Sequence, residues 1–355
     1  MKNKNDILRA TVEANPNIAI VKYWGNRDEK LTLPMEGSNS VTLDEQLRTR
    51  TTVMFSNKFK EDEIWINGKK LETVEELEKP MRVLNFLSDI IRLKAKIASD
   101  SIVPIAGGLA GSAAGLCAIT FAIASAIGYN FSTKELSMIS RLGSGSACRS
   151  VYGGFVEWKR EIYLESYATQ IADEKYWEDF RIVIGICDSR EKKVKSRTGM
   201  IQTVKNSILY PERLKYLPDI LRESRRAIIQ RDHQKLFEIA MRDSNNMHAV
   251  MMDTWPPIMY LNDTSKEIIN KIHEFNSDDI KAGYSFDAGP NPAIFTLDKH
   301  VYDVKKILAD SGIKNIFVSK VGSKPRILNN ERDHLIDEYG NIIRVNNRHN
   351  SIIKL

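Results

Sequence analysis

The sequence predicts an α+β protein built of two lobes, with a ligand site between them. In each half of the chain, runs of β-branched and aromatic residues come first and stretches with helical periodicity follow. The chain has 355 residues, of which 42% are apolar, so it can bury a substantial core. Because ligand sites commonly form where two such units meet, we expect the functional residues to gather there.

The first half begins with strands and continues with helices. Residues 8–22 and 41–68 alternate or run apolar, and Asn67 with Gly68 supplies a hairpin turn. Apolar residues recur with the helical period in three later stretches, 80–97, 113–128 and 134–142. We expect these elements to form an N-terminal lobe of residues 1–179.

The second half opens with the apolar run 182–186, which is typical of a buried strand. Amphipathic helices are predicted over 198–208, 217–230, 232–248 and 264–276, and further strands over 293–295 and 316–318. These elements define a C-terminal lobe of residues 180–328. Residues 329–355 are polar and charged, and we expect a peripheral extension there.

Composition argues against several classes of protein. The net charge of +6 is modest and basic residues alternate with acidic ones, so nucleic-acid binding is not expected. Cys117, Cys148 and Cys187 lack the spacing of a disulfide framework or zinc site, which is typical of reduced thiols in a cytoplasmic protein. The N-terminus lacks a signal-peptide pattern, and glycines interrupt the apolar region 102–129, so we expect neither secretion nor a membrane span.

A glycine-rich stretch, residues 104–115, leads directly into a predicted helix. Glycine lets the backbone approach a ligand closely, and the free N–H groups at a helix start favour an anion. We therefore predict a phosphate loop that includes Gly108, Gly111 and Ser112. A helix of small residues packed against a neighbour is the alternative. The stretch is neither a Walker A loop nor a Rossmann fingerprint, because it lacks GK[ST] and a suitably placed acidic residue.

Three charged residues stand out elsewhere. Arg149 lies on a second glycine-rich turn, residues 143–154, where it could grip a carboxylate or phosphate or belong to an ordinary polar loop. Lys22 follows four apolar strand residues, so it either lies at a strand end or points into a cleft. Asp287 precedes a Gly-Pro turn, where it is either a reactive acid or a turn-capping residue.

Five stretches, in this order, resemble the mevalonate diphosphate decarboxylases of the GHMP kinase superfamily. They are NIAIVKYWG, the glycine-rich stretch, GSGSACRSVYGGFVEW, DSNNMHAVMMDTWPPIMYLN and FDAGPN, and the resemblance extends from residue 9 to Leu328. It implies a two-lobed GHMP-kinase-like fold and a homodimer. In that family ATP phosphorylates the C3 hydroxyl of mevalonate diphosphate, phosphate then departs, and the C1 carboxylate leaves as carbon dioxide.

The resemblance also implies roles for single residues. Asp287 matches the acid beside the C3 oxygen, Lys22 the lysine that organises this centre, and Arg149 a third catalytic residue. The substrate-binding residues that it implies are Asn17, Tyr23, Ser144, Ser146, Lys195, Ser196 and Arg197. It implies no metal ligand. Fixed charges around a developing cation and a departing phosphate are the main means by which such a site can stabilise its transition state.

The sequence departs from this family in its ligand sites. Asn26 stands where the family usually has a lysine that contacts the diphosphate, and Lys195 stands where it has serine or glycine. The family's Asn-Asn-Phe-Pro-Thr reads Ser-Ile-Val-Pro-Ile over residues 101–105, and its paired serines have become Gly111 and Ser112. Together these changes predict a weaker nucleotide site, a weaker diphosphate site and a stronger internal anion site.

We therefore expect decarboxylation of mevalonate 3,5-bisphosphate to isopentenyl phosphate without ATP, as in an ATP-independent branch of the family. Three alternatives stay open. The protein could be an ATP- and Mg²⁺-dependent decarboxylase of mevalonate diphosphate or 5-phosphomevalonate, a 3-kinase that does not decarboxylate, or a ligand-binding relative without catalysis. The expected partner is a small phosphorylated mevalonate, with neither nucleic acid nor membrane, and we expect a cytoplasmic homodimer.

Overall fold

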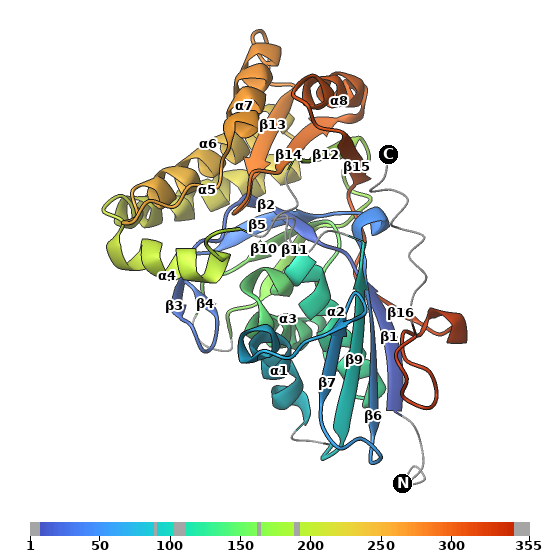
Figure 1. Ribbon diagram of the computed structural model, residues 1–355. Coiled ribbons are helices and arrows are strands. Elements are labelled where there is room, and N and C mark those ends of the chain that lie inside the picture. The colour runs from blue at the N-terminus through green and yellow to red at the C-terminus, as the bar shows by residue number, and fades with distance from the viewer. Residues whose placement is uncertain (1–7, 89–90, 103–110, 162–164, 188–191, 344–355) are drawn as a thin grey trace.

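The computed structural model describes residues 8–88, 91–102, 111–161, 165–187 and 192–343 (Figure 1). The N-terminal half lies below and the C-terminal half above in this view, and each half contains sheet and helix. The α+β class and the two-lobed arrangement predicted from the sequence are confirmed.

The N-terminal lobe contains two main sheets. One has six strands in the order β16-β1-β6-β9-β7-β8, with β7 and β9 parallel, and the other has four in the order β11-β10-β5-β2. The strands are β1 (Leu8–Ala14), β2 (Asn17–Val21), β5 (Ser38–Thr42), β6 (Thr49–Ser56), β7 (Glu63–Ile66), β8 (Lys69–Lys70), β9 (Lys94–Ser101), β10 (Phe155–Trp158), β11 (Ala168–Ala172) and β16 (Arg326–Leu328). A small hairpin consists of β3 (Asn26–Asp28) and β4 (Leu33–Pro34). The helices are α1 (Val74–Ser88), α2 (Gly111–Ala126) and α3 (Thr133–Gly143), and α2 packs on β1 and β6.

The C-terminal lobe is one antiparallel sheet with helices around it. The sheet has the order β13-β14-β12-β15. Its strands are β12 (Phe180–Ile186), β13 (Ala282–Phe286), β14 (Pro292–Leu297) and β15 (Asn315–Lys320). The helices are α4 (Ser196–Asn206), α5 (Tyr210–Gln230), α6 (His233–Met252), α7 (Asp263–Phe275) and α8 (Val301–Asp310).

The helix predicted over 80–97 is wrong in its second part. Helix α1 ends at Ser88, and Lys94 begins strand β9. Residues 94–97 also fit a period of two, because Ala95 and Ile97 are buried while Lys94 and Lys96 are not. Pairing of β9 along the whole of β6 then decides in favour of a strand.

The two lobes share one core. Ile18 and Ile20 of β2 and Val41 of β5 belong to the same buried cluster as Phe180 and Phe295 of the C-terminal sheet. This packing holds the end of β2 against the C-terminal lobe, close to α6. Residues from both lobes therefore lie at fixed positions along the interface between the lobes, which we call the seam.

After β15 the chain returns to the N-terminal lobe. Strand β16 pairs with β1, and residues after it continue along the same sheet, where Leu335 and Ile336 are buried with Met54 and Ala98 (Figure 1). The sequence predicts a peripheral extension from residue 329. The apolar side chains of Leu335 and Ile336 cover one face of this sheet. The peripheral extension and the lobe boundaries at residues 179 and 328 stay predictions, although β16 itself pairs within the N-terminal sheet.

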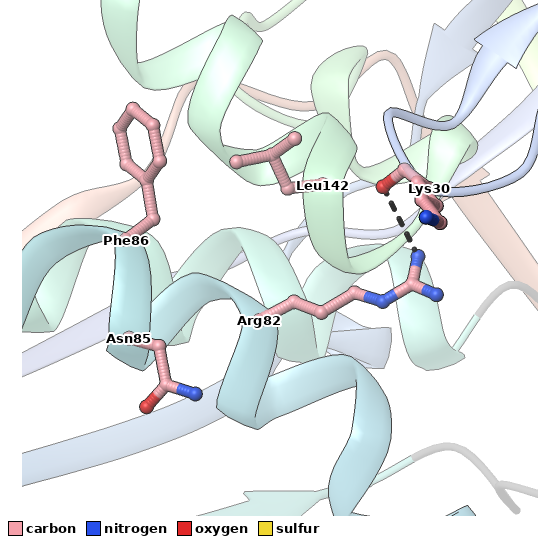
Figure 2. Close-up of a pocket in the computed structure, with 5 residues that line it drawn as sticks. All are labelled: Lys30, Arg82, Asn85, Phe86 and Leu142. Atoms are coloured by element: carbon pink, nitrogen blue, oxygen red, sulfur yellow. Dashed lines mark hydrogen bonds between the residues drawn. The ribbon is translucent and has the colours of Figure 1, made fainter.

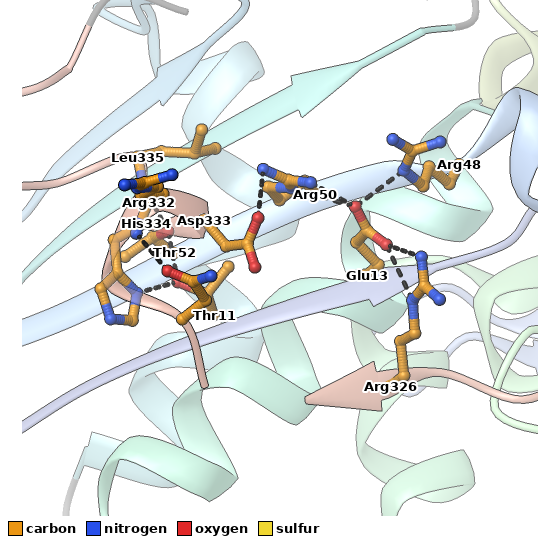
Figure 3. Close-up of polar contacts among 11 residues, drawn as sticks. Thr11, Glu13, Arg48, Arg50, Thr52, Arg326, Arg332, Asp333, His334 and Leu335 are labelled. Carbon is orange, nitrogen blue, oxygen red and sulfur yellow. Dashed lines mark hydrogen bonds and ion pairs between the residues drawn. The ribbon is translucent and has the colours of Figure 1, made fainter. Parts of the chain in front are cut away.

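A buried carboxylate, that of Glu13, anchors strand β16 to the N-terminal sheet. Glu13 of β1 is 3% exposed and accepts hydrogen bonds of 2.7–3.0 Å from Arg48, Arg50 and Arg326 (Figure 3). Burial raises the pKa of Glu13, but these hydrogen bonds outweigh burial and the pKa lies below its ordinary value. Arg326 belongs to β16, so the cluster ties the last strand to the first.

Replacing Glu13 with glutamine should lower the free energy of unfolding at pH 7 by about 2 kcal/mol, because three partly buried cations would lose their counter-charge. Urea denaturation measures this loss. Since the folded pKa is depressed, the wild-type advantage should be present above the unfolded pKa of Glu and disappear as the pH falls through the folded pKa. As a control, Glu165→Gln removes an exposed pair with Lys134 and should change stability by less than about 0.5 kcal/mol. Equal stability of Glu13→Gln and the wild type would contradict the role of Glu13.

Candidate active site

Lys22 and Asp287 meet at the seam between the lobes. Lys22 Nζ lies 2.5 Å from Asp287 Oδ1, in an ion pair that joins the end of β2 to the turn after β13. The Lys22 side chain is 2% exposed and that of Asp287 is 29% exposed, so a ligand would reach the pair from the Asp287 side. A cation and a carboxylate in contact can act together on one oxygen of a ligand.

Arg149 is buried near this pair, within a network of polar side chains. Its guanidinium donates to Asn17 Oδ1 at 3.2 Å, to Ser40 Oγ at 3.1 Å and to Ser38 Oγ at 2.7 Å. Burial lowers the pKa of Arg149, and the charge of Asp287 is among those that oppose this shift. Arg149 is thus a fixed positive charge within electrostatic range of Asp287. No pattern in the sequence indicates Ser38 and Ser40, because they lie within an ordinary strand, β5.

Tyr23 joins the first motif to the serine-bearing turn. Its ring lies against Gly145, where an added Cβ would come within 2.8 Å of ring carbons, so that position requires glycine. Ser144 and Ser146 flank this glycine with their Oγ atoms 3.2 Å apart. The Tyr23 hydroxyl donates to Asn26 Oδ1, and burial holds the pKa of Tyr23 well above its ordinary value. The structure therefore brings Tyr23 against the turn that carries Ser144 and Ser146, and the role of all three in substrate binding stays a prediction.

The start of α4 carries the predicted residues Lys195, Ser196 and Arg197. Arg197 donates to Glu29 Oε2 at 3.2 Å and to Glu78 Oε1 at 2.8 Å. Lys195 pairs with Glu75 at 2.8 Å, and its side chain is 54% exposed. Arg197 is therefore held by carboxylates from two elements, while Lys195 lies at the surface.

Two half-buried lysines beside this group, Lys192 and Lys79, are not among the residues predicted from the sequence. Lys192 Nζ donates to Ser196 Oγ at 3.1 Å and lies within electrostatic range of Asp287. Burial lowers the pKa of both Lys192 and Lys79, and the charge of Arg197 lowers that of Lys79 further. The negative charge of an anion bound here would raise the pKa of both lysines toward its ordinary value. The basic run over residues 192–197 could have indicated Lys192, but no pattern in α1 distinguishes Lys79.

An open pocket with a volume of about 430 Å³ lies between α1 and α3 (Figure 2). It is lined by Lys30, Arg82, Asn85, Phe86 and Leu142. Arg82 donates to Glu78 Oε1 at 2.6 Å, and Arg197 donates to the same oxygen. The pocket thus adjoins the Arg197 group, although no residue that the sequence singled out lines it.

The predicted phosphate loop is described only in part. Gly108 lies outside the described residues, whereas Gly111 and Ser112 form the first turn of α2. The α2 helix itself is largely buried, as the alternative of a closely packed small-residue helix requires. A role of Gly111 and Ser112 in binding phosphate stays a prediction.

His248 of α6 lies behind the Lys22–Asp287 pair. Its Nε2 is 3.4 Å from the backbone oxygen of Phe286. Burial, together with the charge of Lys22, lowers the pKa of His248 to about 4. The imidazole is therefore neutral near pH 7. It belongs to the stretch DSNNMHAV, which carries the family resemblance, but the sequence alone assigns it no role.

Comparison with known proteins identifies the family. Residues 14–168 match the diphosphomevalonate decarboxylase-like N-terminal domain, and residues 182–312 match the mevalonate 5-diphosphate decarboxylase C-terminal domain. The diphosphomevalonate decarboxylase of Bos taurus is 41% identical over 327 residues, which cover 85% of this chain and 80% of the relative. The chain belongs to the mevalonate diphosphate decarboxylase family.

Solved structures agree with this assignment. The mevalonate diphosphate decarboxylase of Staphylococcus aureus superposes with a TM-score of 0.86 and 34% identity, over 91% of this chain and 99% of that one. A structure solved in complex with MVAPP, AMPPCP and magnesium gives a TM-score of 0.85 and 32% identity, over 92% and 100%. This decarboxylase is therefore a carboxy-lyase of the mevalonate pathway with a GHMP-kinase-like fold.

The matches do not single out the ATP-independent branch expected from the sequence, since the relatives are named for mevalonate diphosphate. Within the described ranges, no helix has the length and apolar character needed to cross a membrane. The cytoplasmic location, the homodimer and the roles of the single site residues stay predictions.

Acid should destabilise the decarboxylase through His248. A histidine with a depressed folded pKa contributes stability that is complete above its unfolded pKa of about 6.5 and is lost as the pH falls toward about 4. Between pH 7 and pH 4 the wild type should lose about 3 kcal/mol more unfolding free energy than His248→Gln, an upper value at roughly 1.4 kcal/mol per pKa unit. Urea denaturation of both proteins at a series of pH values tests this. Parallel pH profiles would show that His248 is protonated as readily in the folded state as in the unfolded state.

Proposed function

We propose that the protein converts mevalonate diphosphate to isopentenyl diphosphate and carbon dioxide, with ATP as the phosphoryl donor. The contact between Lys22 and Asp287 carries the proposal, because it offers a cation and a carboxylate at one buried point where C3 of the substrate would react. The relatives support the choice of substrate. The proteins of Bos taurus and Homo sapiens are named diphosphomevalonate decarboxylases, and one solved relative contains MVAPP, AMPPCP and magnesium.

The first step would be phosphoryl transfer to the C3 oxygen. The C3 hydroxyl would give up its proton, with Asp287 as the nearby acceptor, while its oxygen takes the terminal phosphoryl group and ADP is released. Lys22 would hold that oxygen by a charge-assisted hydrogen bond. Both groups are fixed by the fold, so little rearrangement is needed when the substrate reacts.

The second step would be loss of phosphate and carbon dioxide. The C3–O bond breaks, phosphate leaves with the bonding electrons, and positive charge develops at C3. The C1–C2 bond then breaks, its electrons form the C2–C3 double bond, and the carboxylate departs as carbon dioxide. Asp287 would stabilise the developing charge at C3, and Arg149 would orient the carboxylate before it leaves.

The nucleotide would bind through its phosphates. The free N–H groups in the first turn of α2, which begins at Gly111, would favour an anion. Mg²⁺ commonly enters such sites with several waters and the substrate's own phosphate oxygens as ligands. Among the residues that the structure describes, no group of three His, Cys, Asp or Glu side chains is placed to hold a metal alone.

Asn26 favours a second candidate function, the decarboxylation of mevalonate 3,5-bisphosphate to isopentenyl phosphate without a nucleotide. Asn26 is buried, accepts the Tyr23 hydroxyl and carries no charge, whereas the family pattern has a lysine there. A 5-monophosphate would need fewer cations at that position than a diphosphate. Lys195 gives this candidate less support than its sequence position does, because its exposed ammonium pairs with Glu75.

One incubation series separates the candidates. Purified enzyme would be given mevalonate diphosphate, 5-phosphomevalonate or mevalonate 3,5-bisphosphate, each with and without ATP-Mg, and carbon dioxide release would be measured. We expect release from mevalonate diphosphate only when ATP is present. Release from the 3,5-bisphosphate without nucleotide would establish the second candidate instead. ADP formation without carbon dioxide would indicate a 3-kinase, and no turnover in any mixture would indicate a ligand-binding relative.

Asp287→Asn should lower kcat by about 100-fold or more, because an amide dipole replaces a carboxylate poorly beside a developing cation. The variant should still fold, with a lower thermal midpoint because Lys22 loses its counter-charge. Steady-state kinetics and thermal unfolding measure the two effects. Asp278→Asn, at an exposed position shortly before β13, is the matched control and should keep wild-type kcat. Near-normal turnover by Asp287→Asn would mean that this residue only caps its turn.

A further inference from the structure

The backbone of Lys22 is held by the C-terminal lobe. Strand β2 ends at Val21, so the peptide groups of Lys22 take no part in the pairing of β2 with β5. Instead, the Lys22 N–H donates to Asp243 Oδ2 at 2.6 Å, and the Lys22 carbonyl accepts from Arg213 Nη2 at 3.1 Å. Both main-chain polar groups of this one residue are thus bound by a pair of side chains from α5 and α6.

Arg213 and Asp243 form an ion pair in the interior. Arg213 Nη1 lies 2.8 Å from Asp243 Oδ1, and the two side chains are 0% and 1% exposed. Arg213 also donates to Asn246 Oδ1 at 2.7 Å, and the Tyr216 hydroxyl donates to Asp243 Oδ1 at 3.1 Å. Burial lowers the pKa of Arg213, but the charge of Asp243 outweighs it and the pKa lies above its ordinary value. The pair is therefore charged and rigidly oriented.

Helix α6 also positions Asp287, the residue that Lys22 contacts. Ser244, the residue after Asp243, accepts the N–H of Phe286 at 3.0 Å, and Phe286 directly precedes Asp287. His248, one turn further along the same helix, lies against the Phe286 carbonyl at 3.4 Å. One helix thus sets the position of the lysine through Asp243 and that of the acid through Ser244 and His248.

We infer that Arg213 and Asp243 are positioning residues that hold Lys22 against Asp287, an inference that rests on the proposed function for its effect on turnover. A buried ion pair adds little net stability compared with apolar residues of the same volume, so stability alone does not account for it. The hydrogen bonds of the pair to the N–H and to the carbonyl of Lys22 do account for it. A displacement of about 1 Å in a reacting group lowers turnover by about 100-fold.

Two variants test the inference. Arg213→Met/Asp243→Leu replaces the pair with apolar side chains and removes both hydrogen bonds to Lys22. It should fold, with a urea midpoint below that of the wild type because the Lys22 N–H and carbonyl lose their partners, and it should lower kcat by about 100-fold. KM should change by less than about 3-fold, because neither residue is among those proposed to bind the substrate. Arg213→Lys keeps the charge but loses the forked geometry that reaches the Lys22 carbonyl, and it should lower kcat by about 10-fold.

The matched control is a second ion pair of α5 that reaches the N-terminal lobe. Arg225 Nη1 lies 2.8 Å from Glu157 Oε2 of β10, and neither side chain is hydrogen-bonded to Lys22. Arg225→Met/Glu157→Gln should keep wild-type kcat. Wild-type kcat in a folded Arg213→Met/Asp243→Leu enzyme would overturn the inference. If that variant does not fold, wild-type kcat in Arg213→Lys would overturn it instead.

A crystal structure of the Arg213→Lys variant separates this inference from the proposed function. The distance between Lys22 Nζ and Asp287 should exceed the 2.5 Å of the wild type by about 0.5 Å. An unchanged distance would overturn the inference even if turnover falls. Should the wild type fail to decarboxylate any mevalonate phosphate, the proposed function fails while this structural measurement still decides whether the pair positions Lys22.

Discussion

The ammonium group of Lys22 is buried between two lobes, and the fold supplies one carboxylate for it, that of Asp287. A charge in such a place is stable only when a counter-charge lies in contact with it, so the turn after β13 must stay close to the end of β2. The shared core keeps them close, since β2 packs with strands of the C-terminal sheet. The lobes therefore cannot be described as independent units that merely face each other. Their packing is a condition for the charged pair to exist.

The other charged side chains of the site are also held by contacts within the protein. Arg149 is buried, and serine and asparagine side chains accept hydrogen bonds from its Nε and Nη1, so it presents a fixed charge rather than a mobile one. Arg197 is held by two carboxylates, and Lys192 and Lys79 lie half-buried beside it. Of Lys22, Arg149 and Asp287, the Asp287 side chain is the most open to solvent. An arrangement of fixed cations around this carboxylate suits a substrate that carries several negative charges.

The sequence predicts the fold class, most helices and the residues that meet at the centre, because each leaves a local pattern. Lys22 follows an apolar strand, Asp287 precedes a Gly-Pro turn, and Arg149 lies among small residues. What it does not predict depends on contacts between distant parts of the chain. Lys94 to Ile97 fit both a helix and a strand until β6 pairs with them, and Leu335 and Ile336 are buried only because the chain returns to the first sheet. Arg213 and Asp243 lie on ordinary amphipathic helices, and only their contact with Lys22 distinguishes them.

The pairing of β16 with β1 has a consequence for the order in which the protein is made. Thr11 lies opposite Leu328, so the first strand of the six-stranded sheet receives its last neighbour only after the entire C-terminal lobe has left the ribosome. Until then β1 has an open edge, the feature through which nascent sheets associate wrongly with other chains. Glu13 likewise meets two of its arginines, Arg48 and Arg50, early and Arg326 late. The N-terminal lobe is a discontinuous unit in synthesis: it starts first and finishes last.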